Sequence, residues 1–414
     1  MLIFYRLLTG LILVLSPIIL IIRLIKKKED FIRFKEKFCF FSEKKIKGKG
    51  KLIWFHGASV GELQSIVPLV EKLNQNKKIK QILITSNTLS SSKIIENLKL
   101  KKIIHQFFPI DSSLVINKFI SYWNPSKAFF IDSEIWPNTI LKLENKKIPI
   151  ILINGRITKK TFSRWKLVKN FSNQIFSKID FCLASSKESV KFLKNLGVKK
   201  INFLGNLKFT QPRNEKIKIN KKTENFFQNK KIWCALSTHF NEEILCGMVH
   251  LSLKKKFKNL LTIIIPRHIH RCDQIKNDLE KISLKVHKSE TKNRLHENTD
   301  IYLVNSYGKA KDYLKYSKHA FLGGSLIDHG GQNPLEAAKF NCNILHGPNV
   351  HNFSEIYKFL QKNRISVKVS NKNNFIKSLR ALFDQKKDRQ KFKVNFKSIG
   401  KNILEKSYKQ INLK

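Results

Sequence analysis

The chain has 414 residues and 42% of them are hydrophobic, which excludes a wholly disordered protein and leaves room for two or three domains with buried cores. Its 80 lysines and arginines against 30 aspartates and glutamates give a formal net charge of +50, an excess that suits nucleic acid or an anionic membrane surface. Because the basic residues do not gather in one arm or helix, a lysine-rich composition of the whole chain is the preferred explanation, and charge alone assigns no function.

The first predicted element is an apolar helix at the amino terminus. Leu7–Ile22 contains no charged residue and lies between Arg6 and Arg23. A helix of this length covers about 24 Å, slightly less than the hydrocarbon core of a bilayer, and the arginine side chains can reach the two interfaces. A cleaved signal peptide is the alternative, but no small-x-small cleavage site follows and three lysines come directly after residue 25. We therefore predict a retained membrane anchor over residues 1–28, with the rest of the protein in the cytoplasm.

From residue 51 onward, short β-rich runs alternate with longer amphipathic runs. The run at 148–153 is apolar on both faces, as expected for a parallel strand covered by helices. This alternation predicts a doubly wound α/β domain over residues 29–209. The strands expected in it are Leu52–His56, Gln81–Thr85, His105–Phe108, Ala128–Ile131, Pro149–Ile153, Phe181–Ala184 and Ile201–Leu204.

A polar, charge-rich stretch at 210–231 interrupts the alternation and is the predicted linker. The pattern restarts over residues 232–385, and the charged tail at 386–414 is expected to form one or two helices. We therefore expect two Rossmann-like α/β domains that face each other across a cleft, with ligands bound at the carboxyl ends of the strands. The strands expected in the second domain are Ile232–Leu236, Leu261–Ile265, Ile301–Val304, Ala320–Leu322, Asn343–Leu345 and Ile365–Val369.

The first candidate site lies where the strand ending at His56 runs into a helix. Two glycines in this turn permit a close substrate approach, and Glu62 falls in the first helical turn, where the helix dipole favours its charged form. Such a carboxylate can accept a proton from a substrate hydroxyl. The alternative, which the local sequence alone favours, is that Ser59 and Glu62 form an ordinary capping box. A dinucleotide-binding loop does not fit, because GxxxG is not GxGxxG.

Two further loops of the first domain carry charged side chains. Asp132 and Glu134 follow a predicted strand, and these carboxylates could bind a metal or cap the helix that begins near Pro137. Lys208 follows the last strand of the domain and is a candidate for contacting an anionic leaving group. A solvated lysine is the alternative in so basic a chain.

Four loops at predicted strand ends of the second domain suit a nucleotide. Glycines followed by the start of a helix present backbone N–H donors to a phosphate. Arg267 could add a charge-assisted hydrogen bond, and Glu336 could accept hydrogen bonds from ribose hydroxyls. The loops are Ser237–His239, Pro266–His268, Gly323–Ser325 and Gly330–Glu336.

The sequence offers no metal or disulfide framework. The 6 cysteines include no CxxC pair, so they are expected to be reduced thiols in a cytosolic compartment. His268 and His270 have no cysteine or carboxylate at a typical ligand spacing, and there is no P-loop or convincing Asp-x-Asp motif. A metal-independent transferase without a cofactor fits these observations.

In combination, these motifs resemble the bacterial Kdo transferases, which move 3-deoxy-D-manno-octulosonic acid (Kdo) from CMP-Kdo onto the lipid A precursor. The family fold is the two-Rossmann GT-B type, and the resemblance covers essentially the whole chain. After the anchor it is carried in order by Gly57–Glu62, Ser133–Asn138, Asn154–Arg156, Gly205–Phe209, Ser237–His239, Pro266–His268, Gly331–Glu336, Gly347–Asn349 and Asn352–Phe353.

The resemblance implies an inverting glycosyltransferase in which Glu62 is the general base and Glu134 and Lys208 stabilise the transition state. The chain departs from the family pattern at Asn305–Lys309, where an acidic residue, threonine, methionine, glycine and glutamate are usual. Asp132 also replaces a usual glutamate, and Gln332 a usual histidine. The residues that the resemblance assigns to CMP are Pro266, Arg267, Tyr307, Gly308, Lys309, Asn333, Pro334, Leu335 and Glu336.

The resemblance also implies the partners: CMP-Kdo as donor, lipid IVA as acceptor in lipopolysaccharide biosynthesis, and no nucleic acid. The implied location is the inner membrane, with a single anchor and the catalytic domains on the cytoplasmic side. Three alternatives stay open. They are another GT-B nucleotide-sugar transferase or a sugar-nucleotide epimerase, a basic nucleic-acid-binding protein, and an inactive relative that scaffolds envelope enzymes.

Overall fold

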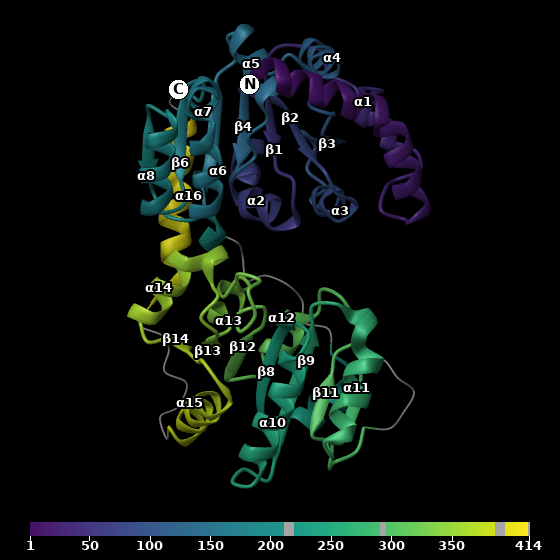
Figure 1. Ribbon diagram of the computed structural model, residues 1–414, viewed down its shortest axis with the longest axis vertical. Helices are drawn as coiled ribbons and strands as arrows, with labels where there is room; N and C mark the ends of the chain where they lie inside the picture. The colour runs from purple at the N-terminus through teal and green to yellow at the C-terminus, as the bar shows by residue number, and fades with distance from the viewer. Residues whose placement is uncertain (211–218, 290–294, 386–393, 413–414) are drawn as a thin grey trace. The chain divides into compact units, whose positions relative to one another are not determined.

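The computed structural model describes residues 1–210, 219–289, 295–385 and 394–412. The chain forms two compact units, the first containing Met1–Pro212 together with Lys397–Lys414 and the second containing Arg213–Phe396. Each unit is built on a seven-stranded sheet in which all neighbouring strands are parallel, with helices packed around it (Figure 1). The two α/β domains expected from the sequence are thus confirmed.

The sheet of the first unit has the strand order β3-β2-β1-β4-β5-β6-β7. Every residue of β5 is buried, as two-sided cover by helices requires. Its core is aromatic, with the Trp54 ring 5.0 Å from that of Phe119 and 5.5 Å from that of Phe130. The strands are β1 Lys51–His56, β2 Ile79–Ser86, β3 Ile103–Phe107, β4 Lys127–Ile131, β5 Ile150–Gly155, β6 Phe181–Ala184 and β7 Ile201–Phe203. The helices are α1 Leu2–Ile25, α2 Val60–Asn74, α3 Leu89–Glu96, α4 Ser113–Trp123, α5 Pro137–Asn145, α6 Lys159–Leu167, α7 Lys169–Phe176, α8 Lys187–Leu196 and α16 Phe396–Asn412, with 3₁₀ turns η1 Arg33–Phe38 and η2 Leu207–Thr210.

The sheet of the second unit has the order β10-β11-β9-β8-β12-β13-β14. Its core gathers around Trp233 and Phe375, whose rings meet edge to face at 5.7 Å. The strands are β8 Lys231–Thr238, β9 Leu260–Pro266, β10 Val286–Lys288, β11 Ile301–Leu303, β12 His319–Leu322, β13 Asn343–His346 and β14 Ser366–Lys368. The helices are α9 Lys221–Gln228, α10 Glu242–Lys254, α11 Cys272–Lys281, α12 Ala310–Leu314, α13 Leu335–Lys339, α14 Ser354–Lys362 and α15 Lys372–Asp384, with 3₁₀ turns η3 Ile269–Arg271 and η4 His351–Phe353.

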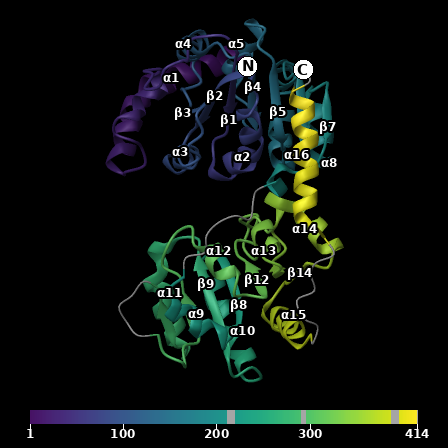
Figure 2. The same cartoon turned by 180° about the vertical axis from the view of Figure 1, so that it is seen from behind.

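Two segments pack more closely on the units than their polar composition suggests. Within the expected linker, α9 buries Phe226 and Phe227, and the Phe227 ring meets Tyr302 at 5.2 Å in the second unit. In the expected tail, α16 lies along the first unit (Figure 2). A Cβ on Gly400 of α16 would lie 2.5 Å from the Phe209 carbonyl oxygen, so α16 approaches the first unit closely there.

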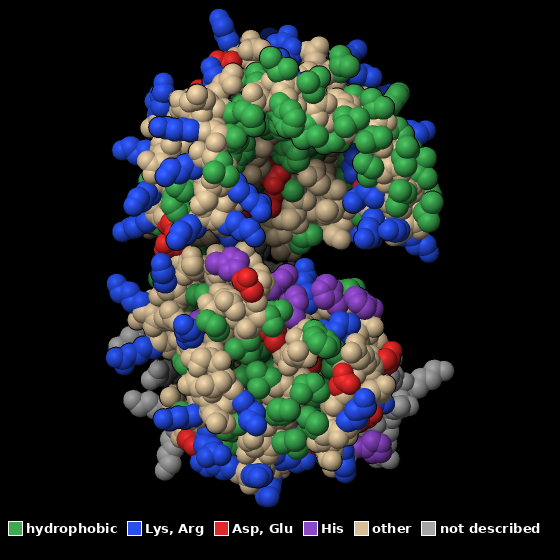
Figure 3. Space-filling model, viewed as in Figure 1, with side chains coloured by type: hydrophobic (Ala, Val, Ile, Leu, Met, Phe, Trp, Pro, Cys, Tyr) green, Lys and Arg blue, Asp and Glu red, His purple; other side chains and the backbone are tan. Residues whose placement is uncertain are grey.

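The amino-terminal helix α1 is long and apolar enough to cross a membrane, and one of its faces rests on the first unit. The Tyr5 hydroxyl donates to Asp111 Oδ2 at 2.7 Å, and Asn138 Nδ2 donates to Thr9 Oγ1 at 3.2 Å. Leu13 packs against the core of the unit. The other face presents exposed apolar side chains (Figure 3), namely Ile3, Phe4, Leu7, Leu8, Leu11, Ile12, Val14, Leu15, Ile18, Ile19, Ile21, Ile22 and Ile25.

Candidate active site

Glu62 lies at the carboxyl end of β1, in the first turn of α2. Ser59 caps this helix, and the capping box expected as the alternative interpretation is present. Glu62 Oε2 accepts from the Ala58 N–H at 2.7 Å, and Oε1 accepts from the Ser59 hydroxyl at 2.8 Å. Burial raises the pKa of Glu62 to about 7, and the negative charges of Asp132 and Glu134 add to this rise. The carboxylate therefore caps its helix and also titrates where a general base operates.

Glu134 follows β4, the neighbour of β1 in the sheet. Its Oε2 accepts a hydrogen bond from Trp136 Nε1 at 2.9 Å and lies 3.1 Å from His56 Nε2. His56 is fully buried and stacks on Phe108, with ring centroids 3.8 Å apart. Burial acts to raise the pKa of Glu134, but the bonds from His56 and Trp136 outweigh it, so the pKa falls below its usual value. Glu134 is therefore held as an anion.

Asp132 connects three elements of the first unit. It adopts a left-handed backbone (φ 53°), and its Oδ1 accepts from Asn154 Nδ2 at 2.5 Å. Its Oδ2 lies 3.4 Å from Lys208 Nζ, and Asn154 Oδ1 accepts from the Leu207 N–H at 2.9 Å. Lys208 is only 8% exposed, which excludes the solvated lysine of the alternative interpretation. The network thus fixes the end of β4, the end of β5 and η2 against one another.

The helix that begins at Pro137 takes its cap from a distant carboxylate. Asp111 accepts from the backbone N–H groups of Asn138 and Thr139 at 3.1 and 2.9 Å. Neither Asp132 nor Glu134 caps this helix, so the interpretation of that pair as a helix cap is wrong. Among the residues the structure describes, no group of three or more His, Cys, Asp or Glu is placed to hold a metal ion.

Arg156 is a further basic residue at this edge of the sheet. Its backbone N–H donates to the Asp132 carbonyl at 3.0 Å. Burial lowers the pKa of Arg156, while the charges of Asp132 and Glu62 act in the opposite direction. Glu62, Glu134 and Lys208, expected to act together, are thus brought to one edge of one sheet, and Figure 3 shows acidic side chains in a hollow of this unit.

In the second unit the expected nucleotide loops all follow strands at the carboxyl edge of the sheet. The strands β11, β9, β8 and β12 are consecutive neighbours, so their loops lie side by side. A Cβ on Gly323 would come 2.5 Å from the Ser237 carbonyl oxygen, so only glycine permits this approach of the loops after β12 and β8. The backbone N–H of Arg267 donates to the Thr238 carbonyl at 3.0 Å, and this hydrogen bond joins the loops after β9 and β8.

Glu242, a residue for which the sequence suggested no role, organises these loops. Its carboxylate is buried and accepts from the backbone N–H groups of His239, Gly324 and Leu326 at 2.9, 2.7 and 3.2 Å. Burial raises the pKa of Glu242 despite these three donors. The next residue, Glu243, pairs with Arg271 at 3.1 Å. Two adjacent glutamates at a helix start were the available signal, but two of the three backbone N–H groups that bind Glu242 are distant in sequence.

The remaining residues assigned to the nucleotide lie in two segments. Tyr307, Gly308 and Lys309 precede α12, and the Tyr307 side chain is 63% exposed. Asn333 Oδ1 accepts from the Leu335 N–H at 3.1 Å at the start of α13. Glu336 lies 3.9 Å from Lys311, which brings the two segments together. Because α13 has only 5 residues, its dipole is weaker than the sequence pattern suggested.

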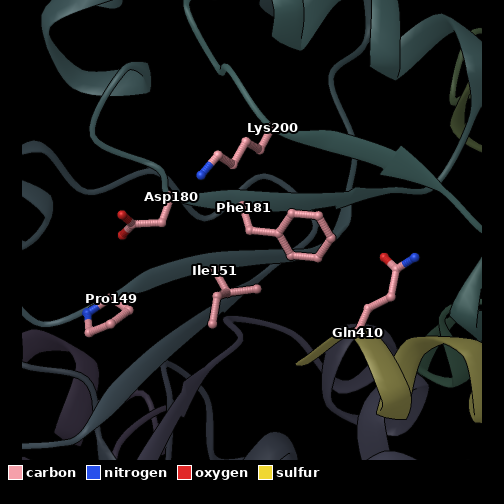
Figure 4. A pocket seen from close by; sticks show the side chains of 6 residues that line it. All are labelled: Pro149, Ile151, Asp180, Phe181, Lys200 and Gln410. Carbon is pink, nitrogen blue, oxygen red and sulfur yellow. The ribbon is translucent and has the colours of Figure 1, made fainter. Parts of the chain in front are cut away.

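A small cavity of about 220 Å³ lies at the opposite edge of the first sheet (Figure 4). Its lining residues Pro149, Asp180 and Lys200 precede β5, β6 and β7, at the amino ends of these strands. Asp180 Oδ2 already accepts from the Ile150 N–H at 2.8 Å. The cavity is therefore separate from the charged edge that carries Glu62.

Comparison with known proteins shows the family of the chain. A family profile described as "3-Deoxy-D-manno-octulosonic-acid transferase (kdotransferase)" matches residues 32–211. A 3-deoxy-D-manno-octulosonic acid transferase of Rickettsia bellii is 31% identical over 93% of this chain and 92% of its own length, and one of Haemophilus influenzae is 29% identical over 92% and 91%. The solved UDP-GlcNAc 2-epimerase of Neisseria meningitidis aligns with 86% of this chain and all of its own, at a TM-score of 0.61 and 15% identity, a likeness of fold alone. The chain therefore belongs to the 3-deoxy-D-manno-octulosonic acid transferase family.

Proposed function

We propose that this protein is an inverting glycosyltransferase that moves Kdo from CMP-Kdo to lipid IVA in lipopolysaccharide biosynthesis. The observation that carries the proposal is the pair of carboxyl groups at adjacent strand ends, in a member of this family. Glu62 has a pKa near neutrality and Glu134 is held as an anion. Two carboxyl groups whose environments separate their pKa values are suited to different roles in one reaction.

In the proposed reaction, Glu62 takes the proton of an acceptor hydroxyl as its oxygen bonds to the anomeric carbon of Kdo. The bond between that carbon and the CMP phosphate oxygen breaks in the same displacement, which inverts the configuration. Positive charge develops on the sugar, where Glu134 stabilises it, and Lys208 offsets the negative charge of the departing CMP. Fixed charges of this kind are usually the largest catalytic contribution.

The donor is assigned to the second unit. Pro266 and Arg267 at the end of β9, residues 307–309 before α12, and Asn333–Glu336 at α13 hold CMP. Two observations support this assignment. The segments follow strands at the same carboxyl edge of the second sheet, and Lys311 of α12 lies 3.9 Å from Glu336 of α13, which brings the segments before these two helices together.

The membrane location belongs to the same proposal. The outer face of α1 is apolar, and basic residues follow the helix at 26–28. We place the exposed apolar face of α1 in the inner membrane, with both units on the cytoplasmic side, where the enzyme meets its lipid acceptor.

The test is to incubate the purified full-length protein with lipid IVA and either CMP-Kdo or UDP-GlcNAc, and to follow both substrates by mass spectrometry. A gain in lipid mass of one or more Kdo units with CMP-Kdo alone supports the proposal. Epimerisation of UDP-GlcNAc, or transfer from it, would contradict the assignment of the donor.

A further inference from the structure

The loop after β8 buries an imidazole whose hydrogen-bonding capacity is not used within the described structure. His239 is 8% exposed, and its Nε2 has no hydrogen-bond partner among the residues that the structure describes. Its backbone N–H is fixed by Glu242, so the residue is held firmly in place. Buried polar atoms in folded proteins are nearly always paired, and an exception calls for an explanation such as a missing ligand.

Two other imidazoles lie beside His239. The His329 ring lies 4.3 Å from it and the His268 ring 5.8 Å, between ring centroids. A Cβ on Gly324 would come within 3.2 Å of His239 Nε2 and of His329 Cδ2. Glycine at this position therefore permits both rings to lie close against the backbone. Histidine side chains gather along this side of the second unit (Figure 3).

The charges facing His239 are mostly positive. Burial lowers the pKa of His239 to about 4, and His329, His268, Arg267 and Arg271 all act in the same direction. The nearby carboxylate of Glu242 is already bound by three backbone N–H groups, and Glu243 is paired with Arg271. A bound anion would relieve the repulsion between these groups and supply an acceptor for Nε2.

We propose that His239 and His329 form a subsite for an anionic oxygen of the sugar nucleotide, either on its phosphate or on the carboxylate of its sugar. This inference rests on the proposed function, because it concerns the binding of the same donor. It gives a role in that binding to two residues to which the family resemblance assigns none. His239 supplies a fixed hydrogen-bond donor from Nε2. His329, exposed beside it, brings a second imidazole to the same anion.

Isothermal titration of the full-length protein with cytidine, CMP, UMP and free Kdo tests this subsite. The first variant is His239→Asn. The second is His329→Gln, which changes an exposed side chain and so tests the subsite even if the buried change perturbs folding. The matched control is His287→Gln on β10. A hydrogen bond to a charged group predicts a loss of about tenfold to a hundredfold in affinity for the ligand that carries the anion. Loss for CMP with unchanged cytidine assigns the phosphate, and loss for free Kdo with unchanged CMP assigns the carboxylate.

Titrations in two buffers of different ionisation enthalpy add a second readout. Near pH 5 the wild type is expected to take up a fraction of a proton per bound anion, because the anion favours the charged form of His239, and His239→Asn is expected to take up less. Equal affinities in wild type and both variants, together with equal proton uptake in wild type and His239→Asn, would overturn the subsite. If UMP binds more tightly than CMP and both variants still weaken it, the subsite stands and the proposed donor is wrong.

Discussion

The carboxyl groups of Glu62 and Glu134 follow adjacent strands, yet their surroundings shift their pKa values in opposite directions. The difference comes from their partners. Glu62 meets backbone and hydroxyl donors and two like charges, whereas Glu134 meets His56 and the Trp136 indole. At neutral pH one group can therefore exchange a proton while the other keeps its charge.

Replacing Glu62 with glutamine separates catalysis from helix capping. The amide oxygen can still accept from the Ala58 N–H, so α2 and the fold are expected to persist. Because Glu62 is the proposed general base, transfer of Kdo is expected to fall by about a hundredfold or more, with CMP affinity unchanged. Steady-state rates and CMP titration of Glu62→Gln measure both quantities. Transfer at the wild-type rate would exclude Glu62 as the base.

The raised pKa of Glu62 also predicts the pH dependence of transfer. The base acts only when deprotonated, so kcat/KM is expected to rise with pH through an inflection near 7. Below the inflection it should fall about tenfold per pH unit. A profile of kcat/KM over about pH 5 to 9, with circular dichroism in the same buffers to exclude unfolding, checks this. An inflection near 4.5, the ordinary value for a glutamate, would contradict the assignment.

The buried pair of Lys208 and Asp132 predicts an effect on stability that is distinct from the catalytic role proposed for Lys208. Lys208→Met leaves the Asp132 carboxylate buried without this cation, a change that costs about 3 to 5 kcal/mol in comparable pairs. Adding Asp132→Asn should recover much of the free energy of unfolding but not transfer. Urea denaturation measures the first and steady-state assays the second.

The matched control for this pair is Lys178→Met. Its partner Glu144 lies at 2.8 Å, but both side chains are a third or more exposed, so the expected change is below about 1 kcal/mol. Equal destabilisation by the two lysine substitutions would show that Lys208 is not in a buried ion pair.

The residues of the site were predictable to different degrees. The sequence singles out Glu62, Glu134 and Lys208, because each lies in a recognisable motif in the segment that follows a strand, and their roles stay predictions. It does not single out Glu242 or the partnership of His56 with Glu134, because their contacts join loops that are far apart in sequence and meet only through the strand order. Sequence fixes which side chains follow a strand, but not which strands become neighbours.

At the scale of elements, α1 is held by its polar face and exposes its apolar one. Tyr5→Phe removes the hydroxyl bonded to Asp111, leaves a buried carboxylate with one donor fewer, and is expected to lower stability by about 1 to 3 kcal/mol. Leu11→Lys changes the outer face, where Leu11 is 56% exposed, and should leave stability nearly unchanged while weakening binding to vesicles.

Urea denaturation and flotation with anionic vesicles measure these two effects of α1 separately. If instead Leu11→Lys unfolds the protein and Tyr5→Phe abolishes vesicle binding, our assignment of the packed face and the membrane-binding face of α1 is wrong.

The strands were predicted well where apolar runs are continuous, as in β5, because burial on both faces leaves no room for polar residues. The edge strand β10 was missed, since its three partly exposed residues, with His287 and Lys288 among them, carry no apolar run. The helix α9 lies in the segment predicted as linker, because its two apolar residues, Phe226 and Phe227, are too few to show a helical hydrophobic periodicity. Its stability comes from tertiary packing on Tyr302 and Tyr313, which local sequence does not reveal.

At the scale of the whole molecule, the second unit is continuous in sequence while the first is not. We expect a fragment comprising Arg213–Phe396 to fold alone and to bind CMP within a few-fold of the full-length affinity, because its sheet and core are complete. Circular dichroism and CMP titration of this fragment check the expectation. A fragment that folds but does not bind CMP would place part of the nucleotide site in the first unit.

Because α16 belongs to the first unit but follows the second unit in sequence, the first unit can be completed only after the second has been translated. Gly400 packs on the Phe209 carbonyl and Lys72 pairs with Glu405, yet α16 is translated only after the entire second unit. The second unit can therefore be complete on the ribosome while the unit that carries Glu62 still lacks α16. Interrupted translation before α16 would leave the first unit incomplete, with the surface near Gly205 that Ile403 covers open to chaperones or proteases.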